Sequence, residues 1–72
     1  MSIYVHFPEL PESILGIVVG MGPGETPMIG IKDTYGQITE WHGKPGVLPT
    51  KEELIDLAIR HVRQSMSNTR RN

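Results

Sequence analysis

The sequence contains one strong signal for a helix, which begins at Thr50. Glycine and proline residues divide the preceding residues 1–49 into short segments. Thr50 is a favourable N-cap, and Glu53 stands three residues later, which completes a capping box. Apolar residues then recur at a spacing that gives a broad helical stripe: Leu54, Ile55, Leu57, Ala58, Ile59, Val62 and Met66. The pattern predicts a helix from about Lys51 to Met66, followed by a flexible basic tail at residues 67–72.

The segments before this helix are short and rich in β-branched residues, which favours strands over helices. Prolines end them because proline cannot donate a ladder hydrogen bond, and glycines provide the turns. We predict strands at residues 2–7, 14–21, 28–32 and 37–42. The sequence Asp33-Thr34-Tyr35-Gly36 suits a type I turn, so the last two strands are expected to form a β-hairpin.

These elements predict the fold class, which is α+β. We expect a small antiparallel sheet of three or four strands with one C-terminal helix packed on one face, and a single domain over residues 1–66. A chain of 72 residues is too short for a second core. The helix is expected to contribute Leu54, Leu57, Ala58 and Val62 to the core.

The sequence contains no recognisable catalytic or metal-binding constellation. It has no cysteine, and its three histidines, His6, His42 and His61, lie too far apart for a zinc motif. We interpret His61 as a surface imidazole near the end of the helix. The glycines at 20, 22 and 24 follow a strand but lead into another strand, so no helix N-terminus awaits a phosphate. We therefore predict a protein that is not an enzyme and that uses no cofactor and no metal.

Charge is unevenly distributed along the chain. The net charge is −1, but residues 1–49 carry two lysines against five acidic residues, and residues 50–72 carry five basic against three acidic residues. The net charge makes nucleic acid an unlikely ligand. The longest apolar run, residues 14–21, is far below the ~20 residues of a membrane-spanning helix. We expect no membrane association and a cytoplasmic location.

Partner contacts are expected at two sets of residues. Tyr35 lies at the predicted hairpin tip, and Trp41, the only tryptophan, is either a core residue or an interface anchor. The helix offers apolar and basic side chains beyond those that one sheet contact needs: Ile55, Ile59, Arg60, Arg63 and Met66. The segment 14–21 is also apolar on both faces. We therefore predict protein partners and a homo-oligomer, unless Leu10, Val47 and Leu48 fold over the spare apolar surface.

One stretch resembles a known group of proteins. In residues 38–57 a strand carrying Trp41 runs through a proline-containing linker into Pro49-Thr50-Lys51-Glu52-Glu53-Leu54 and a helix. This is similar to a pattern in small bacteriophage tail and tail-fibre accessory proteins. The resemblance implies a phage or prophage structural protein, located in the host cytoplasm or the virion. Two alternatives are a small inhibitor of a host enzyme and a weak nucleic-acid-binding protein that uses the basic C-terminal end.

Overall fold

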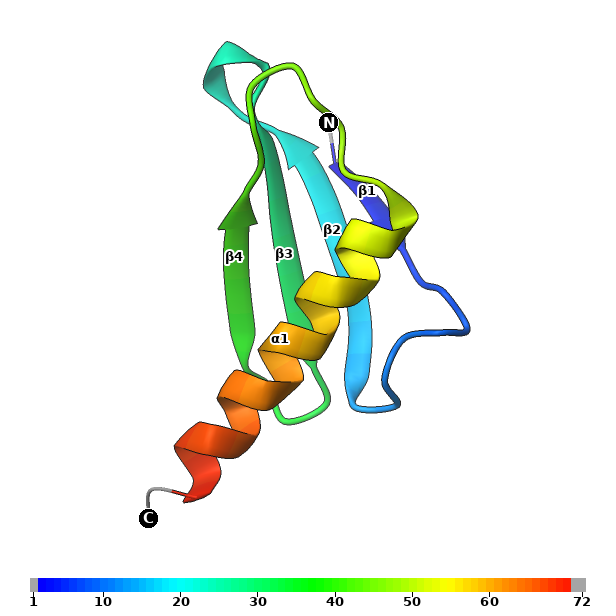
Figure 1. Cartoon of the computed structure of the whole chain (residues 1–72), viewed down its shortest axis with the longest axis vertical. Coiled ribbons are helices and arrows are strands. Elements are labelled where there is room, and N and C mark those ends of the chain that lie inside the picture. Colours follow the sequence, from blue (N-terminus) through cyan, green and yellow to red (C-terminus); the bar gives the residue numbers. More distant parts are fainter. Residues whose placement is uncertain (1, 71–72) are drawn as a thin grey trace.

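The predicted α+β architecture is confirmed. The structure, a computed structural model, describes residues 2–70, with side chains through Met66. Its strands are β1 (Ser2–Val5), β2 (Ile14–Met21), β3 (Pro27–Asp33) and β4 (Ile38–His42), and the helix α1 spans Lys51–Arg70. The strands form one antiparallel sheet in the order β1-β2-β3-β4, and α1 crosses one face of it (Figure 1). The helix thus extends four residues beyond its predicted end at Met66, and the side chains of the predicted flexible tail, residues 67–72, lie outside the described part.

The sheet has an inner face under α1 and an outer face on the opposite side. Neighbouring strands pair Ile17 with Ile31 and Val19 with Ile29, and these side chains point toward the helix. The alternate residues point outward, because successive side chains of a strand lie on opposite faces. The side chains of β4 alternate in the same way: Trp41 packs against the core, whereas Ile38 is 63% exposed.

A β-bulge at the start of β2 was not predicted. Ile14 pairs with Asp33 and Gly16 pairs with Lys32, so Leu15 is an extra residue in the ladder. A bulge changes which side chains face the core. It lets Ile14 and Ile17, three residues apart, both point inward, while Leu15 is 48% exposed.

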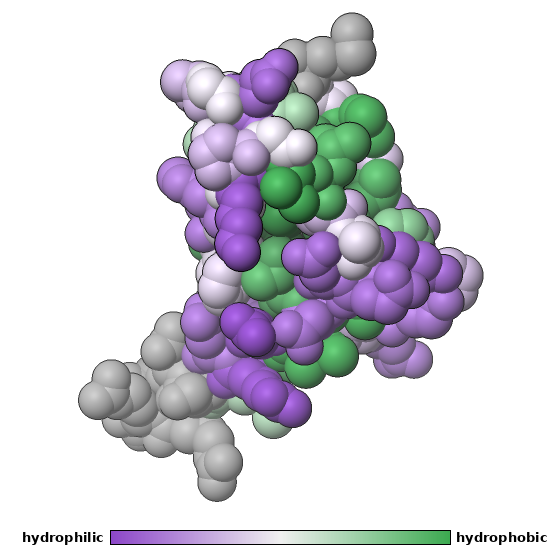
Figure 2. All heavy atoms as spheres, turned by 45° about the horizontal axis from the view of Figure 1, so that its top comes forward, coloured by the Kyte–Doolittle hydropathy of each residue, from purple (hydrophilic) through white to green (hydrophobic). Residues whose placement is uncertain are grey.

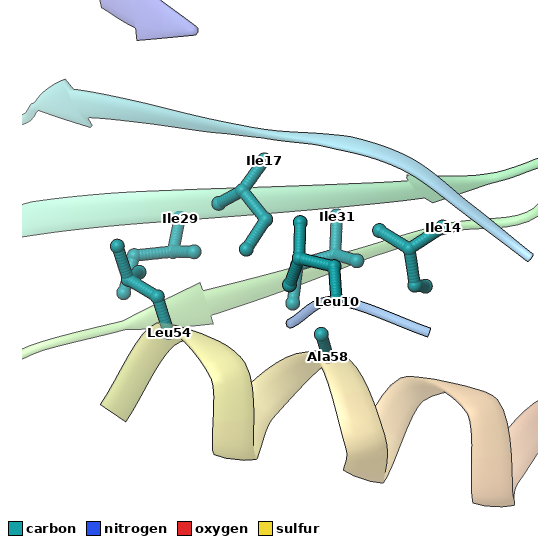
Figure 3. Packing of buried hydrophobic residues seen from close by; sticks show 7 residues of the cluster. All are labelled: Leu10, Ile14, Ile17, Ile29, Ile31, Leu54 and Ala58. Atoms are coloured by element: carbon teal, nitrogen blue, oxygen red, sulfur yellow. The ribbon is translucent and has the colours of Figure 1, made fainter. Parts of the chain in front are cut away.

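The core lies between the inner face and α1. Figure 3 shows isoleucines of β2 and β3 pointing toward Leu54 and Ala58 of the helix, with Leu10 reaching in from the β1–β2 loop. Leu57 and Val62 are only partly buried at its margins, and Ile55, expected at another edge, also packs against it. Of the loop residues that were candidates to cover spare apolar surface, Leu10 does so, whereas Val47 and Leu48 remain exposed.

The capping box at the start of α1 forms as predicted. The amide of Glu53 donates to Thr50 Oγ1 over 3.2 Å, and the amide of Thr50 donates to Glu53 Oε1 over 3.1 Å. Both bonds satisfy amide groups in a first turn that has no helical partners for them. An ion pair of 2.8 Å between Lys51 and Glu9 joins this turn to the β1–β2 loop.

Substitution Thr50→Ala is expected to lower the free energy of unfolding by about 1 kcal/mol, the typical cost of a lost N-cap. The matched control is Thr26→Ala. Thr26 lies between β2 and β3 and does not cap α1, so its substitution should cost less. Urea titration followed by circular dichroism measures both. Equal costs would contradict the capping role.

Candidate functional site

A buried pair of polar side chains joins the sheet to the helix. Asp33, at the end of β3, and His61, in α1, are each 1% exposed. Asp33 Oδ2 lies 2.8 Å from His61 Nε2. Since a carboxylate can only accept hydrogen bonds, Nε2 is the protonated ring nitrogen that donates. The interpretation of His61 as a surface imidazole was therefore wrong: the side chain faces the sheet because it follows Leu54 and Ala58 on one helical stripe.

Two further residues extend this pair into a chain of hydrogen bonds. Thr39 Oγ1 lies 2.7 Å from His61 Nδ1, and Trp41 Nε1 donates to Thr39 Oγ1 over 3.1 Å. In the neutral imidazole Nδ1 accepts, so the Thr39 hydroxyl donates to it. The chain then runs in one direction, from the Trp41 indole through Thr39 and His61 to the Asp33 carboxylate. Every buried side-chain polar atom of the described residues has a hydrogen-bond partner.

Asp33 has a second role, which is the one that the sequence predicted. Its Oδ1 accepts hydrogen bonds of 2.9 Å from the amides of Tyr35 and Gln37, and the amide of Gly36 donates to its carbonyl. Gly36 has φ = 84°, the left-handed conformation that this turn requires. Burial opposes ionisation of the carboxyl, but the bonds from His61, Gln37 and Tyr35 outweigh it and hold the pKa of Asp33 below its ordinary value. One carboxylate thus fixes the hairpin and docks the helix.

The order of these groups matches the nucleophile, base and orienting acid of a hydrolytic triad, but their surroundings do not. A triad histidine must reach a substrate and a nucleophile must be free to attack. The His61 ring is buried, and the Thr39 oxygen already accepts a bond from Trp41. The two hollows described below are not lined by Asp33, Thr39 or His61. The chain of hydrogen bonds is therefore best explained as a stabilising link.

The depressed pKa of Asp33 predicts acid sensitivity. Above the ordinary aspartate pKa of 3.8 the stabilisation is complete, and it is lost as the pH falls through that value toward the lower folded pKa. We expect thermal melts of the wild type to move steeply to lower temperature below about pH 4. Asp33→Asn, which cannot ionise, should show a shallower decline; parallel curves would contradict the assignment.

No helix of the described residues covers the outer face of the sheet. Its apolar side chains are exposed: Tyr4 by 64%, Val18 by 41%, Met28 by 37% and Ile38 by 63%. They border a shallow hollow of about 650 Å³ over the middle of the sheet. The Tyr4 ring lies across Gly16, and its hydroxyl donates to the carbonyl of Leu15 over 2.6 Å. Large exposed apolar patches on small domains usually mark interaction sites.

Glycines alternate with larger residues on this outer face. Across β2 and β3 the register places Val18 opposite Gly30, Gly20 opposite Met28, and Gly16 opposite Lys32. Each pair thus combines one projecting side chain with one position that has none. A Cβ atom added at Gly30 would meet nothing within 4 Å. Gly30 is therefore an open hole beside Val18, whereas the Tyr4 ring already covers Gly16.

The structure separates the residues that the sequence marked for partner contact. Trp41 and Arg60 line a second hollow, of about 540 Å³, between β4, α1 and the linker that joins them. Tyr35 lies at the hairpin tip, 78% exposed, and Ile59 and Met66 are exposed by 37% and 59% on the helix. Arg63 is exposed, and Arg60 pairs with Asp56 over 3.2 Å. Figure 2, which views the helix-bearing side, shows a hydrophobic patch bordered by polar side chains.

Sequence reasoning missed the outer-face residues and the partnership of Asp33 with His61. The signal for the latter was present, since positions 54, 58 and 61 lie on one helical stripe.

Comparisons with protein-family models, with curated proteins and with solved structures gave no match. In the described part of the chain, no helix is long and apolar enough to cross a membrane, and no cluster of metal-binding side chains is found.

Proposed function

We propose that the protein is a non-enzymatic interaction or assembly protein that contacts a protein partner through the outer face of its sheet. One observation carries this proposal: the face opposite α1 exposes Tyr4, Val18, Met28 and Ile38 around a single hollow. A sheet normally buries both faces or keeps the open one polar. Here the open face carries apolar side chains at positions where alternation would allow polar ones.

The resemblance of residues 38–57 to small bacteriophage tail and tail-fibre accessory proteins supports a more specific form of the proposal, a phage or prophage structural accessory protein. Such proteins work by contacting other chains, which agrees with an apolar face and with a histidine–aspartate pair that is closed to substrates. In this form of the proposal the protein acts in the host cytoplasm or the virion.

Site-specific photocrosslinking in the cell that produces the protein tests the proposal. A benzophenone side chain is placed at Ile38, 63% exposed on the outer face, and, as the matched control, at Tyr35, 78% exposed in the same hairpin. We expect discrete protein adducts from position 38 and few from position 35. Equal labelling at both positions, or none at position 38, would contradict an outer-face contact.

A further inference from the structure

Resting on the proposed function, we infer that the occupant of the outer face is a second copy of this chain, stacked face to face about a two-fold axis that runs parallel to the strands between β2 and β3. The pairing register carries this inference. A rotation of 180° about such an axis places each β2 position over the β3 position that is its own cross-strand neighbour.

This operator matches knobs to holes. Val18 of one copy faces Gly30 of the other, and Met28 faces Gly20, because these residues are opposite each other within one sheet. Large side chains then enter glycine positions on both sides of the axis. Interdigitated side chains are how the two layers of a β-sandwich pack. A two-fold axis perpendicular to the strands would place β2 over β2 and lose this match.

Charge also permits the pairing. The residues that line the outer hollow include two charged side chains, Lys32 and Glu40, so this surface is neutral in sum. The operator places Lys32 over Gly16 of the second copy, whose backbone is covered by the Tyr4 ring. A lysine over a tyrosine ring is a favourable cation–π arrangement. Glu40 is placed over Tyr4, whereas the two copies of Lys32 lie side by side across the axis, a like-charge contact that contributes to the weakness of the dimer.

The area of the outer face sets the expected affinity of the dimer. Strands of 4 to 8 residues, spaced about 4.8 Å apart with about 3.3 Å per residue, give a projected face of about 400 Å² per copy. Stable complexes bury about 800 Å² per partner, so this dimer falls in the weak class. We therefore expect reversible association with a dissociation constant in the micromolar range or weaker.

Gly30→Val is the decisive variant. A Cβ atom added at Gly30 meets nothing within 4 Å in the monomer, and valine favours strands, so the variant should fold as well as the wild type. In the dimer it fills the hole that receives Val18. Sedimentation equilibrium from about 10 µM to about 1 mM should show a wild-type dimer and an affinity at least tenfold weaker for Gly30→Val. Circular dichroism confirms folding of each variant.

Exchanging Val18 and Gly30 tests the position of the two-fold axis. Val18→Gly should weaken the dimer by removing the knob, whereas the double variant V18G/G30V places a valine opposite a glycine again and should recover affinity to within a few-fold. Ile59→Ala, on the exposed flank of the helix, is the control and should leave association unchanged.

Three results would overturn the inference: a wild type that stays monomeric over the whole range, a dimer that Gly30→Val leaves intact, or a double variant that does not recover. A monomeric wild type that still crosslinks from position 38 to a different protein would overturn the second copy as occupant and leave the proposed function standing. A monomer without adducts would contradict both.

Discussion

Asp33→Ala is expected to leave most of the protein unfolded at room temperature. The substitution removes the acceptor for the buried His61 Nε2 and for the amides of Tyr35 and Gln37. Hydrogen bonds to a charged group contribute about 1.5–3 kcal/mol each, so the loss of three of them costs at least about 4 kcal/mol. A domain of this size has a net stability of roughly 3–5 kcal/mol, so the loss is comparable to the whole. Far-UV and near-UV circular dichroism at neutral pH measure the folded fraction.

Two matched variants separate this link from a general loss of charge. Asp56→Ala removes an exposed aspartate of α1 that pairs with Arg60, and should cost well under about 1 kcal/mol. Asp33→Asn keeps an acceptor for the two amides, and His61 can reverse its tautomer to accept from the new amide group, so its cost should lie between those of Asp33→Ala and Asp56→Ala. A folded Asp33→Ala variant with wild-type stability would show that the pair does not hold α1 to the sheet.

Ile31→Ala is the second substitution with a large expected effect. Its side chain is fully buried in the middle of β3, facing α1. Truncation of a buried isoleucine to alanine costs about 2–5 kcal/mol, because transfer free energy is lost and a cavity remains. Ile38→Ala, in the same hairpin but 63% exposed, is the control and should change stability little when measured at a concentration where the protein is monomeric.

Stability is measured by chemical denaturation. One m-value, the slope of the free energy of unfolding against denaturant concentration, is fitted to all variants. Leu57→Ala provides an intermediate case, because Leu57 is only partly buried at the margin of the core. The expected order of destabilisation is therefore Ile31, then Leu57, then Ile38. Equal effects of Ile31→Ala and Ile38→Ala would contradict the assignment of inner and outer faces.

Local sequence patterns were sufficient to predict single elements of the fold, such as the start of the helix and the hairpin turn. The capping box at Thr50 and the turn at Asp33 need only nearby residues, and both form as predicted. The bulge at Leu15 was missed because it depends on pairing with β3, which the periodicity of one strand does not contain. The fold class followed from the order of the elements, since one helix after several short strands can cover one face of a sheet.

The candidate site was harder to predict because it depends on residues that the fold brings together. His61 and Asp33 are 28 positions apart, and each has an ordinary local explanation, as a residue near a helix end and as a turn former. The outer face was anticipated only in part, from the apolar character of residues 14–21 on both sides. The sequence pointed to Ile55, Ile59 and Met66 for oligomer contacts, but Ile55 packs against the core.

Concentration-dependent NMR tests most directly whether the open sheet face, and not the helix, meets a second copy. Amide spectra are compared between dilute and concentrated samples of the wild type. We predict shifts that concentrate at Val18, Met28 and Gly30, with Ile59 and Arg63 on the exposed side of α1 unchanged. Shifts centred on the helix, or spectra that do not change while the protein remains folded, would contradict the account.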